Sequence, residues 1–351
     1  MVLCTMSALD AYAYPIPEDL IAHAPINPRD AARLLVVDTT RGTVTCAHVR
    51  DLPMLVPHAC VVYNDTTVVP ARLNAERGDG TPIELLMLVD QGIGPDGSVR
   101  ALVNMRVSVG EMLRVHGASF MVLENHEKSM LLRYQGTPEE LSHLLVAVGQ
   151  TPLPPYIRSH ADETTRRREY QSMFASRDPS VAAPTASLHF TPELVQRMTE
   201  VDVTWVPVTL QVGLGTFAPV FDENFTSRRL HRERYCIPRE TAATIVHMKA
   251  HGRPVLALGT TVLRTLESGA ALIRDGVGGV GETDLFIFPP YHFAVADMLL
   301  TNFHVPRSSL LCLVQAFLEH KGVSRHITDL YRYAIAERFR LYSYGDAMLV
   351  A

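Results

Sequence analysis

The chain has 351 residues, of which 47% are apolar and 20% are charged, and its formal net charge at pH 7 is -5. This composition is typical of a globular protein long enough for roughly two domains of about 100–200 residues each. The acidic balance excludes a nucleic-acid-binding domain that is basic in bulk, so any contact with RNA must depend on local basic patches.

Five cysteines are scattered along the chain, and none belongs to a Cys-x-x-Cys pair. The spacing therefore predicts neither a zinc site nor a disulfide framework, and free thiols are typical of a reducing compartment. No basic segment precedes an apolar run near residue 1, and no uncharged apolar run reaches about 18 residues. We expect a cytoplasmic protein with no membrane span and no bound metal.

The first part of the chain predicts a short proline-flanked helix over 18–24 and two apolar strands over 34–38 and 60–63. Arg41 and Gly42 indicate a hairpin turn, with residues 44–49 as the return strand.

From residue 73 to about 150 the pattern changes to short β-rich runs separated by Gly, Asp and Asn turns. Strands at such close spacing are typical of a small antiparallel barrel or sandwich. A helix follows, because Thr137 is a good N-cap, Glu140 completes a capping box and Gly149 is a good terminator.

After residue 180, predicted strands and helices alternate, which indicates an α/β sheet covered by helices. The predicted strands are 205–212, 255–258 and 285–288, and the predicted helices are 192–200, 239–251, 261–274 and 308–320. Ligands in such sheets usually bind at the carboxyl ends of the strands.

Two turns within residues 181–219 are suited to a ligand. Thr185, Ser187 and His189 form a polar turn, and Gly213 with Gly215 lets backbone approach a ligand closely. The alternative is an ordinary capped helix and an ordinary strand end.

The segment 255–268 is an apolar strand, a glycine, two threonines and a helix. Free N–H groups at the start of such a helix bind carboxylate or phosphate, and Thr260, Arg264 and Glu267 fall on one helix face. The alternative is a capped surface helix with an exposed Arg–Glu pair.

Other candidates lie on loops and strands. Asn302 and His304 precede a helix, where they could read a base or transfer a proton. His231 and Glu233 share a strand face if that segment is extended. A basic run, Arg158 with Arg166–Arg168, could bind phosphates, although a solvated helix face with acidic neighbours is the more ordinary explanation. No P-loop, GxGxxG, HExxH or GxSxG motif is present.

Nine segments span about residues 14 to 348 in this order: PEDLIAHAPINPRDAARLLVVD, NDTTVVPARL, PLPPYI, VAAPTASLHFTPEL, VTLQVGLGTFAPV, ALGTTVLRTLES, TDLFIFPPY, LLTNFHVPRSSLL and YSYGDAM. Together they resemble the S-adenosylmethionine:tRNA ribosyltransferase-isomerase family of queuosine biosynthesis.

The resemblance implies transfer of the ribosyl group of S-adenosylmethionine to 7-aminomethyl-7-deazaguanine in a tRNA, with isomerisation to epoxyqueuosine and release of adenine and methionine. S-adenosylmethionine would be a co-substrate, and no cofactor would be bound permanently. It also implies a large mixed-sheet α/β domain, residues 1–72 and 151–351, with a small antiparallel β-barrel domain, 73–150, inserted into it.

The resemblance also implies the site residues. His189, His231 or His304 would act as acid or base, Asp65 and Glu233 would polarise them, and Thr260, Thr261 and Arg264 would hold the methionine carboxylate. The further expected binding residues are Arg72, Thr185, Thr209, Gln211, Gly213, Gly215, Thr216, Phe217, Glu267, Asn302, Tyr344 and Asp346.

Six positions depart from the family pattern: Thr67, Ser187, Gln211, Ala218, Val262 and Pro290. Thr67 and Ala218 stand where arginines are usual, and Gln211 stands where a histidine is usual. Two other functions therefore stay open, namely a paralogous enzyme with a small-molecule acceptor and a catalytically silent S-adenosylmethionine-binding protein.

Overall fold

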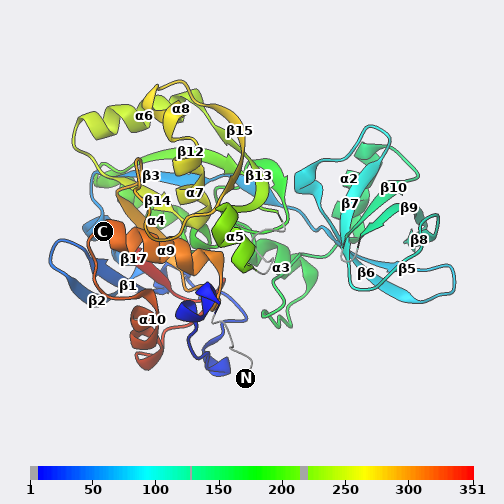
Figure 1. Cartoon of the computed structure of the whole chain (residues 1–351), viewed down its shortest axis with the longest axis horizontal. Helices are drawn as coiled ribbons and strands as arrows, with labels where there is room; N and C mark the ends of the chain where they lie inside the picture. The colour runs from blue at the N-terminus through cyan, green and yellow to red at the C-terminus, as the bar shows by residue number, and fades with distance from the viewer. Residues whose placement is uncertain (1–6, 127–128, 214–219) are drawn as a thin grey trace.

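The computed structural model describes residues 7–126, 129–213 and 220–351. It contains a mixed nine-stranded sheet and a closed six-stranded antiparallel barrel, which lie on opposite sides of the molecule in Figure 1. The predicted fold class, a large mixed α/β sheet with a small antiparallel barrel, is confirmed.

The nine strands of the large sheet come from both ends of the chain. In spatial order they are β15 (Gly279–Leu285), β13 (Arg229–Ile237), β12 (Thr204–Leu210), β3 (Cys60–Asn64), β14 (Val255–Leu258), β16 (Met298–Asn302), β17 (Ala347–Val350), β1 (Arg33–Asp38) and β2 (Thr43–His48). The four central strands β12, β3, β14 and β16 are mutually parallel, so their carboxyl ends meet at one edge. A short pair, β4 (Thr66–Val68) with β11 (Arg177–Ser180), lies outside this sheet.

Helices cover both faces of the large sheet. Strand β14 is buried at all four residues, which is typical of a parallel strand with helices on both sides. Val255 and Ala257 face one core, and Leu256 and Leu258 face the other. The first core contains α6 (Arg239–Ala250), α7 (Thr260–Ser268), α9 (Ser309–His320) and α10 (Ile327–Ala336), and the second contains α1 (Leu52–Leu55) and α4 (Pro192–Glu200).

The barrel has its own apolar core. Its strands, in order around the barrel, are β10 (Ser129–Tyr134), β7 (Ser98–Val103), β6 (Pro82–Met87), β5 (Arg72–Glu76), β8 (Met112–Val115) and β9 (Ala118–His126). Helix α2 (Pro138–Val148) follows, and Thr137 and Glu140 form the predicted capping box. Arg72 and Gln150 exchange both backbone hydrogen bonds where the chain enters and leaves, so we propose residues 73–150 as the inserted unit.

Three predicted elements differ in the structure. Only Glu18–Leu20 is helical, as a 3-10 turn, because the next residue, Ile21, pairs with Leu341 in a β-bridge. The helix predicted over 261–274 is divided at Gly269 into α7 and α8 (Ala270–Arg274).

The strand predicted over 285–288 was wrong. Phe286 and Ile287 are apolar because they pack into the core, whereas the strand β15 precedes them and pairs with β13. The local patterns gave no prediction of β13, β16, β17 or α10, or of the short helices α3 (Glu163–Glu169) and α5 (Asp222–Ser227).

Candidate active site

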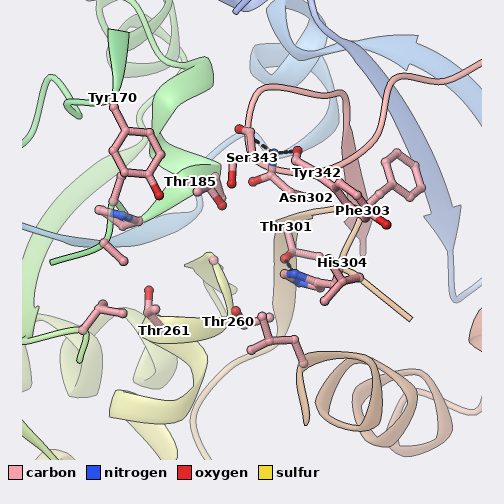
Figure 2. A pocket seen from close by; sticks show the side chains of 18 of the residues that line it. Tyr170, Thr185, Thr260, Thr261, Thr301, Asn302, Phe303, His304, Tyr342 and Ser343 are labelled. Carbon is pink, nitrogen blue, oxygen red and sulfur yellow. Dashed lines mark hydrogen bonds between the residues drawn. The ribbon is translucent and has the colours of Figure 1, made fainter. Parts of the chain in front are cut away.

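A pocket lies at the carboxyl ends of β14 and β16, as expected for an open α/β sheet (Figure 2). It encloses about 710 Å³ of space, part of which is open to solvent. We call it the central pocket. It is lined by Tyr156, Tyr170, Ala182, Ala183, Pro184, Thr185, Ala186, Val212, Gly259, Thr260, Thr261, Thr301, Asn302, Phe303, His304, Val305, Leu310, Tyr342 and Ser343.

Helix α7 begins directly at the central pocket. Gly259 precedes it with a φ of 99°, a conformation that glycine adopts without a steric penalty. Thr260 and Thr261 follow, and Figure 2 shows both on the pocket wall below Thr185. The Thr261 hydroxyl is buried and has no hydrogen-bond partner among the described residues. This turn therefore offers free N–H groups and a hydroxyl to an anionic group.

Asn302 presents an acceptor to the same pocket. Its Nδ2 atom bonds Nε2 of His189 at 3.2 Å and the carbonyl of Tyr342 at 3.2 Å. Its Oδ1 atom is buried and has no partner within the described ranges. Because the amide nitrogen is held on the protein side, the oxygen is left for a ligand.

His304 lies in the pocket wall and His189 lies behind it. The Nε2 atom of His304 is 2.9 Å from the Thr301 hydroxyl, and the His304 backbone N–H donates to the Tyr331 hydroxyl oxygen. Burial lowers the pKa of each histidine to about 4, and for His189 the arginines Arg29 and Arg340 add to that effect. Both imidazoles are therefore neutral at pH 7 and able to accept a proton.

The central pocket is lined by hydroxyls, amides, aromatic rings and apolar groups. None of its described lining residues is Asp, Glu, Lys or Arg. Charged side chains gather instead in an adjoining cavity, which shares Thr260, Thr261 and Leu310 with the central pocket.

Glu233 and Arg264 form a buried ion pair in that adjoining cavity. Arg264 Nη1 lies 2.6 Å from Glu233 Oε2, and the side chains are 12% and 2% exposed respectively. The Gly213 N–H donates to Glu233 Oε1 at 3.2 Å. Burial raises the pKa of Glu233, although Arg264 and the Gly213 N–H act in the opposite direction.

Of the three residues predicted to converge, Thr260 and Arg264 line the adjoining cavity, whereas Glu267 does not. Glu267 accepts hydrogen bonds from the backbone N–H groups of Ala294 and Val295, so it holds a loop rather than pairing with Arg264. Asp346 has a similar place, since it accepts from the backbone N–H groups of Arg33 and Arg340. Neither carboxylate lines the central pocket.

Asp65, which directly follows β3, contacts Thr209 of the neighbouring strand β12. The Thr209 hydroxyl donates to Asp65 Oδ1 at 2.7 Å, and Arg177 pairs with the other oxygen at 3.4 Å. Burial raises the pKa of Asp65. Gln211 lies near this pair in a separate surface cleft with Thr209.

The remaining candidates lie elsewhere. His231 is exposed whereas Glu233 is buried, so the two do not share an environment, although the His231 carbonyl accepts from Arg264. Arg72 pairs with Glu84 in the barrel. Tyr344 is buried against Tyr170, and its hydroxyl has no partner among the described residues. Gly215, Thr216 and Phe217 lie outside the described residues.

Two arginines of the basic run, Arg166 and Arg167, are engaged in the fold, whereas Arg158 and Arg168 are exposed. Arg167 pairs with Glu163 and donates to the carbonyls of Val146 and Gly149, at the end of α2. Arg166 donates to the Ser159 carbonyl, and Arg168 is exposed.

None of the described departures from the family pattern lines the central pocket. Val262 and Ser187 are buried, and Thr67 lies in β4. Pro290 follows a cis peptide bond, and Gln211 lines other clefts. Ala218 lies outside the described residues. The five described substitutions therefore lie outside the lining of the central pocket.

Sequence reasoning missed Asp90, a buried carboxyl of the barrel that reaches Gly213. The only sequence signal is an acid directly after the apolar run 85–89 and ahead of Gly92. It also missed the aromatic wall of the pocket, to which Tyr170 and Tyr342 belong.

Within the described residues no group of three His, Cys, Asp or Glu side chains is arranged to hold a metal ion. No described helix combines the length and apolar character that crossing a membrane requires.

The fold is a mixed sheet joined to a closed barrel, with a polar pocket at the carboxyl edge of the sheet. These features define an α/β protein of the small-molecule-binding class. The comparison with known proteins is more specific. Residues 9–350 match the family described as queuosine biosynthesis protein. The chain belongs to this family.

Characterised relatives align over nearly the whole chain. A protein of Trichlorobacter lovleyi is 42% identical over 97% of this chain and 98% of its own length, and one of Thermus thermophilus is 43% identical over 98% and 100%. Both are named S-adenosylmethionine:tRNA ribosyltransferase-isomerase. The crystal structure of an S-adenosylmethionine tRNA ribosyltransferase from Thermotoga maritima is 31% identical, covers 97% of this chain and 100% of its own, and has a TM-score of 0.55.

Proposed function

We propose that this protein is an S-adenosylmethionine:tRNA ribosyltransferase-isomerase. It transfers the ribosyl group of S-adenosylmethionine to 7-aminomethyl-7-deazaguanine in a tRNA and isomerises it to give epoxyqueuosine. The observation that carries the proposal is the 42–43% identity to relatives of that name over almost the entire chain. A tRNA substrate places the enzyme in the cytoplasm, with S-adenosylmethionine as co-substrate and no permanently bound cofactor.

In this proposal the central pocket binds S-adenosylmethionine. The methionine carboxylate lies at the start of α7, where Thr260, Thr261 and the free N–H groups of the helix receive it. The unpartnered Oδ1 atom of Asn302 accepts from a hydroxyl or amino group of the co-substrate. Arg264, which the sequence also suggested for the carboxylate, compensates Glu233 instead.

In the same proposal, His304 is the residue that accepts a proton. The sulfonium makes the neighbouring 5′ carbon acidic, so the reaction requires a base at the pocket wall. The neutral His304 imidazole, bonded to Thr301, is available as that base. His189 acts through Asn302 and is a positioning residue.

Carboxylates outside the pocket complete the site. Glu233 polarises the adjoining cavity, and Arg264 opposes the rise in its pKa that burial causes. Asp65 has the corresponding role beside Thr209.

A turnover assay tests the function. Purified protein is incubated with S-adenosylmethionine, with or without tRNA that carries 7-aminomethyl-7-deazaguanine, while released adenine and methionine are measured. We expect release only with the modified tRNA, and epoxyqueuosine in the digested RNA. If release is absent or independent of the tRNA, the proposed function is wrong.

A further inference from the structure

The barrel contributes a buried carboxyl to the edge of the large sheet. Asp90 lies in η5 (Val89–Gln91), between strands β6 and β7, and is 9% exposed. Its Oδ2 atom is so close to Gly213 that a Cβ atom added there would lie 2.4 Å from it. Its Oδ1 atom has no hydrogen-bond partner in the part of the chain that the structure describes.

Asp90 and Glu233 lie near one another but differ in their partners. Glu233 accepts from the Gly213 N–H and pairs with Arg264, so its charge is compensated. Asp90 has no ion pair with any described residue. We call Asp90, Gly213, Glu233 and Arg264 the junction cluster. An unpaired buried carboxylate is costly unless it binds a cation or a proton.

Burial and the charged groups that face Asp90 together set its pKa. Burial is the main cause, and the Glu233 charge adds to it, so the pKa of Asp90 rises to about 7. Arg232, Arg234 and Glu282 line the same small cavity. Both arginines pair with Glu282: Arg232 Nη1 lies 3.7 Å from its Oε2 atom, and Arg234 Nε lies 3.6 Å from its Oε1 atom.

A cleft between the barrel and the large sheet leads to Asp90. Its walls are mainly apolar on the barrel side, and Gln211 and Arg234 line the sheet side. The cavity volume is about 300 Å³, at the lower end of the range of roughly 300–1,000 Å³ for small-molecule sites.

We propose that this cleft receives the aminomethyl base of the tRNA and that Asp90 removes the proton that makes its amine unreactive. The inference rests on the proposed function. The amine is an ammonium ion near neutral pH and has no lone pair for attack. One N–H bond breaks, its electron pair stays on nitrogen, and an O–H bond forms on Asp90. The ammonium and carboxylate become a neutral pair, which burial favours.

The substitution Asp90→Asn tests the assignment, because it keeps the shape and removes the base. With the full-length protein and modified tRNA, kcat is expected to fall roughly 100-fold to 10,000-fold. Wild-type kcat/KM is expected to rise through about pH 7, and the variant should lose this rise. The KM for S-adenosylmethionine should not change. The matched control is Asp79→Asn, an exposed aspartate in a barrel turn.

Two further measurements separate failure of this inference from failure of the proposed function. A melting curve checks that the Asp90→Asn variant is folded. Calorimetry with free 7-aminomethyl-7-deazaguanine measures the cleft without turnover, and affinity is expected to fall at least about 10-fold in the variant. If the wild type forms product and Asp90→Asn keeps its kcat and pH profile, the inference is overturned. If the wild type forms no product, the proposed function is wrong. Independently of turnover, equal affinity of the wild type and Asp90→Asn for the free base overturns the inference.

Discussion

The central pocket adjoins, at the start of α7, the cavity that holds Glu233 and Arg264 of the junction cluster, yet the two regions contain different kinds of side chain. The pocket wall consists of fixed dipoles and aromatic rings, such as the Asn302 amide and the Thr261 hydroxyl. The junction cluster consists of buried charges, and one of its carboxyls comes from the barrel.

The two regions therefore differ in how their charge responds to pH. Neutral dipoles hold a charged ligand without the desolvation penalty that buried ions incur, and their state does not change near neutral pH. The junction cluster holds carboxyls whose pKa values burial raises, so its state changes with pH and with what binds there. The barrel is therefore connected to the chemistry rather than being only an appended module.

The largest effect is expected in the central pocket, from His304→Ala. Removing the proposed base should lower kcat by roughly 100-fold to 10,000-fold. His189→Ala, which acts through Asn302, should have a smaller effect that includes weaker binding of S-adenosylmethionine. Single-turnover kinetics measures both variants. Unchanged turnover in His304→Ala would remove this residue from the catalytic list.

Breaking the ion pair of the junction cluster should reduce stability. Glu233→Ala leaves Arg264 buried without its partner, and the free energy of unfolding should fall by about 3–5 kcal/mol. Urea denaturation measures the change. The control is Glu282→Ala, which removes an exposed partner of Arg232 and Arg234 and should change little. Equal effects of the two variants would contradict a special role for the buried pair.

The dipoles of the central pocket should control affinity rather than rate. Thr261→Val removes the unpartnered hydroxyl, and the Kd for S-adenosylmethionine should rise about 10-fold, the loss of one hydrogen bond to a charged group. The matched control is Thr265→Val, one turn along α7, whose hydroxyl donates to the Thr261 carbonyl. Calorimetry compares both with the wild type, and a larger loss in the control would refute the assignment.

The smallest effect is the pH dependence of stability. The contributions of the two regions to stability should change in opposite directions as pH changes. Asp90 has a raised folded-state pKa of about 7, so the folded chain binds the extra proton between about pH 4 and 7. Stability from this group is lost as pH rises through 7. His304 has a lowered pKa of about 4, so its contribution is lost as pH falls from about 6.5 towards 4.

Melting curves of Asp90→Asn and His304→Gln across this pH range measure the two contributions. Relative to the wild type, the first variant should gain stability as pH rises to 7, and the second should gain as pH falls. Parallel curves for both variants would show that neither group titrates as its surroundings imply.

Local patterns in the sequence predicted the elements whose signals are local. The capping box of Thr137 and Glu140 and the continuous apolar run of β14 both depend on neighbours within a few residues. The order of family-like segments predicted the fold class and the family, since nearly the whole chain carries them.

Contacts between distant parts of the chain decided the rest. Edge strand β15 carries glycines and charges, and only its pairing with β13 makes it a strand. Glu267 and Asp346 look like ligand residues in the sequence, yet each satisfies backbone N–H groups that tertiary packing brings to it.

The sequence by itself determined the family, the fold class and the residue types at the carboxyl edge of the sheet. Only the tertiary structure decided which of them meet. Asn302 and His189, 113 residues apart, share a hydrogen bond. Asp90 reaches Gly213 because the barrel lies against the end of the large sheet. The physical reason is that burial and pairing set the pKa of a polar group and decide which of its hydrogen-bonding atoms stay unpartnered. Burial and pairing depend on neighbours that the local sequence does not specify.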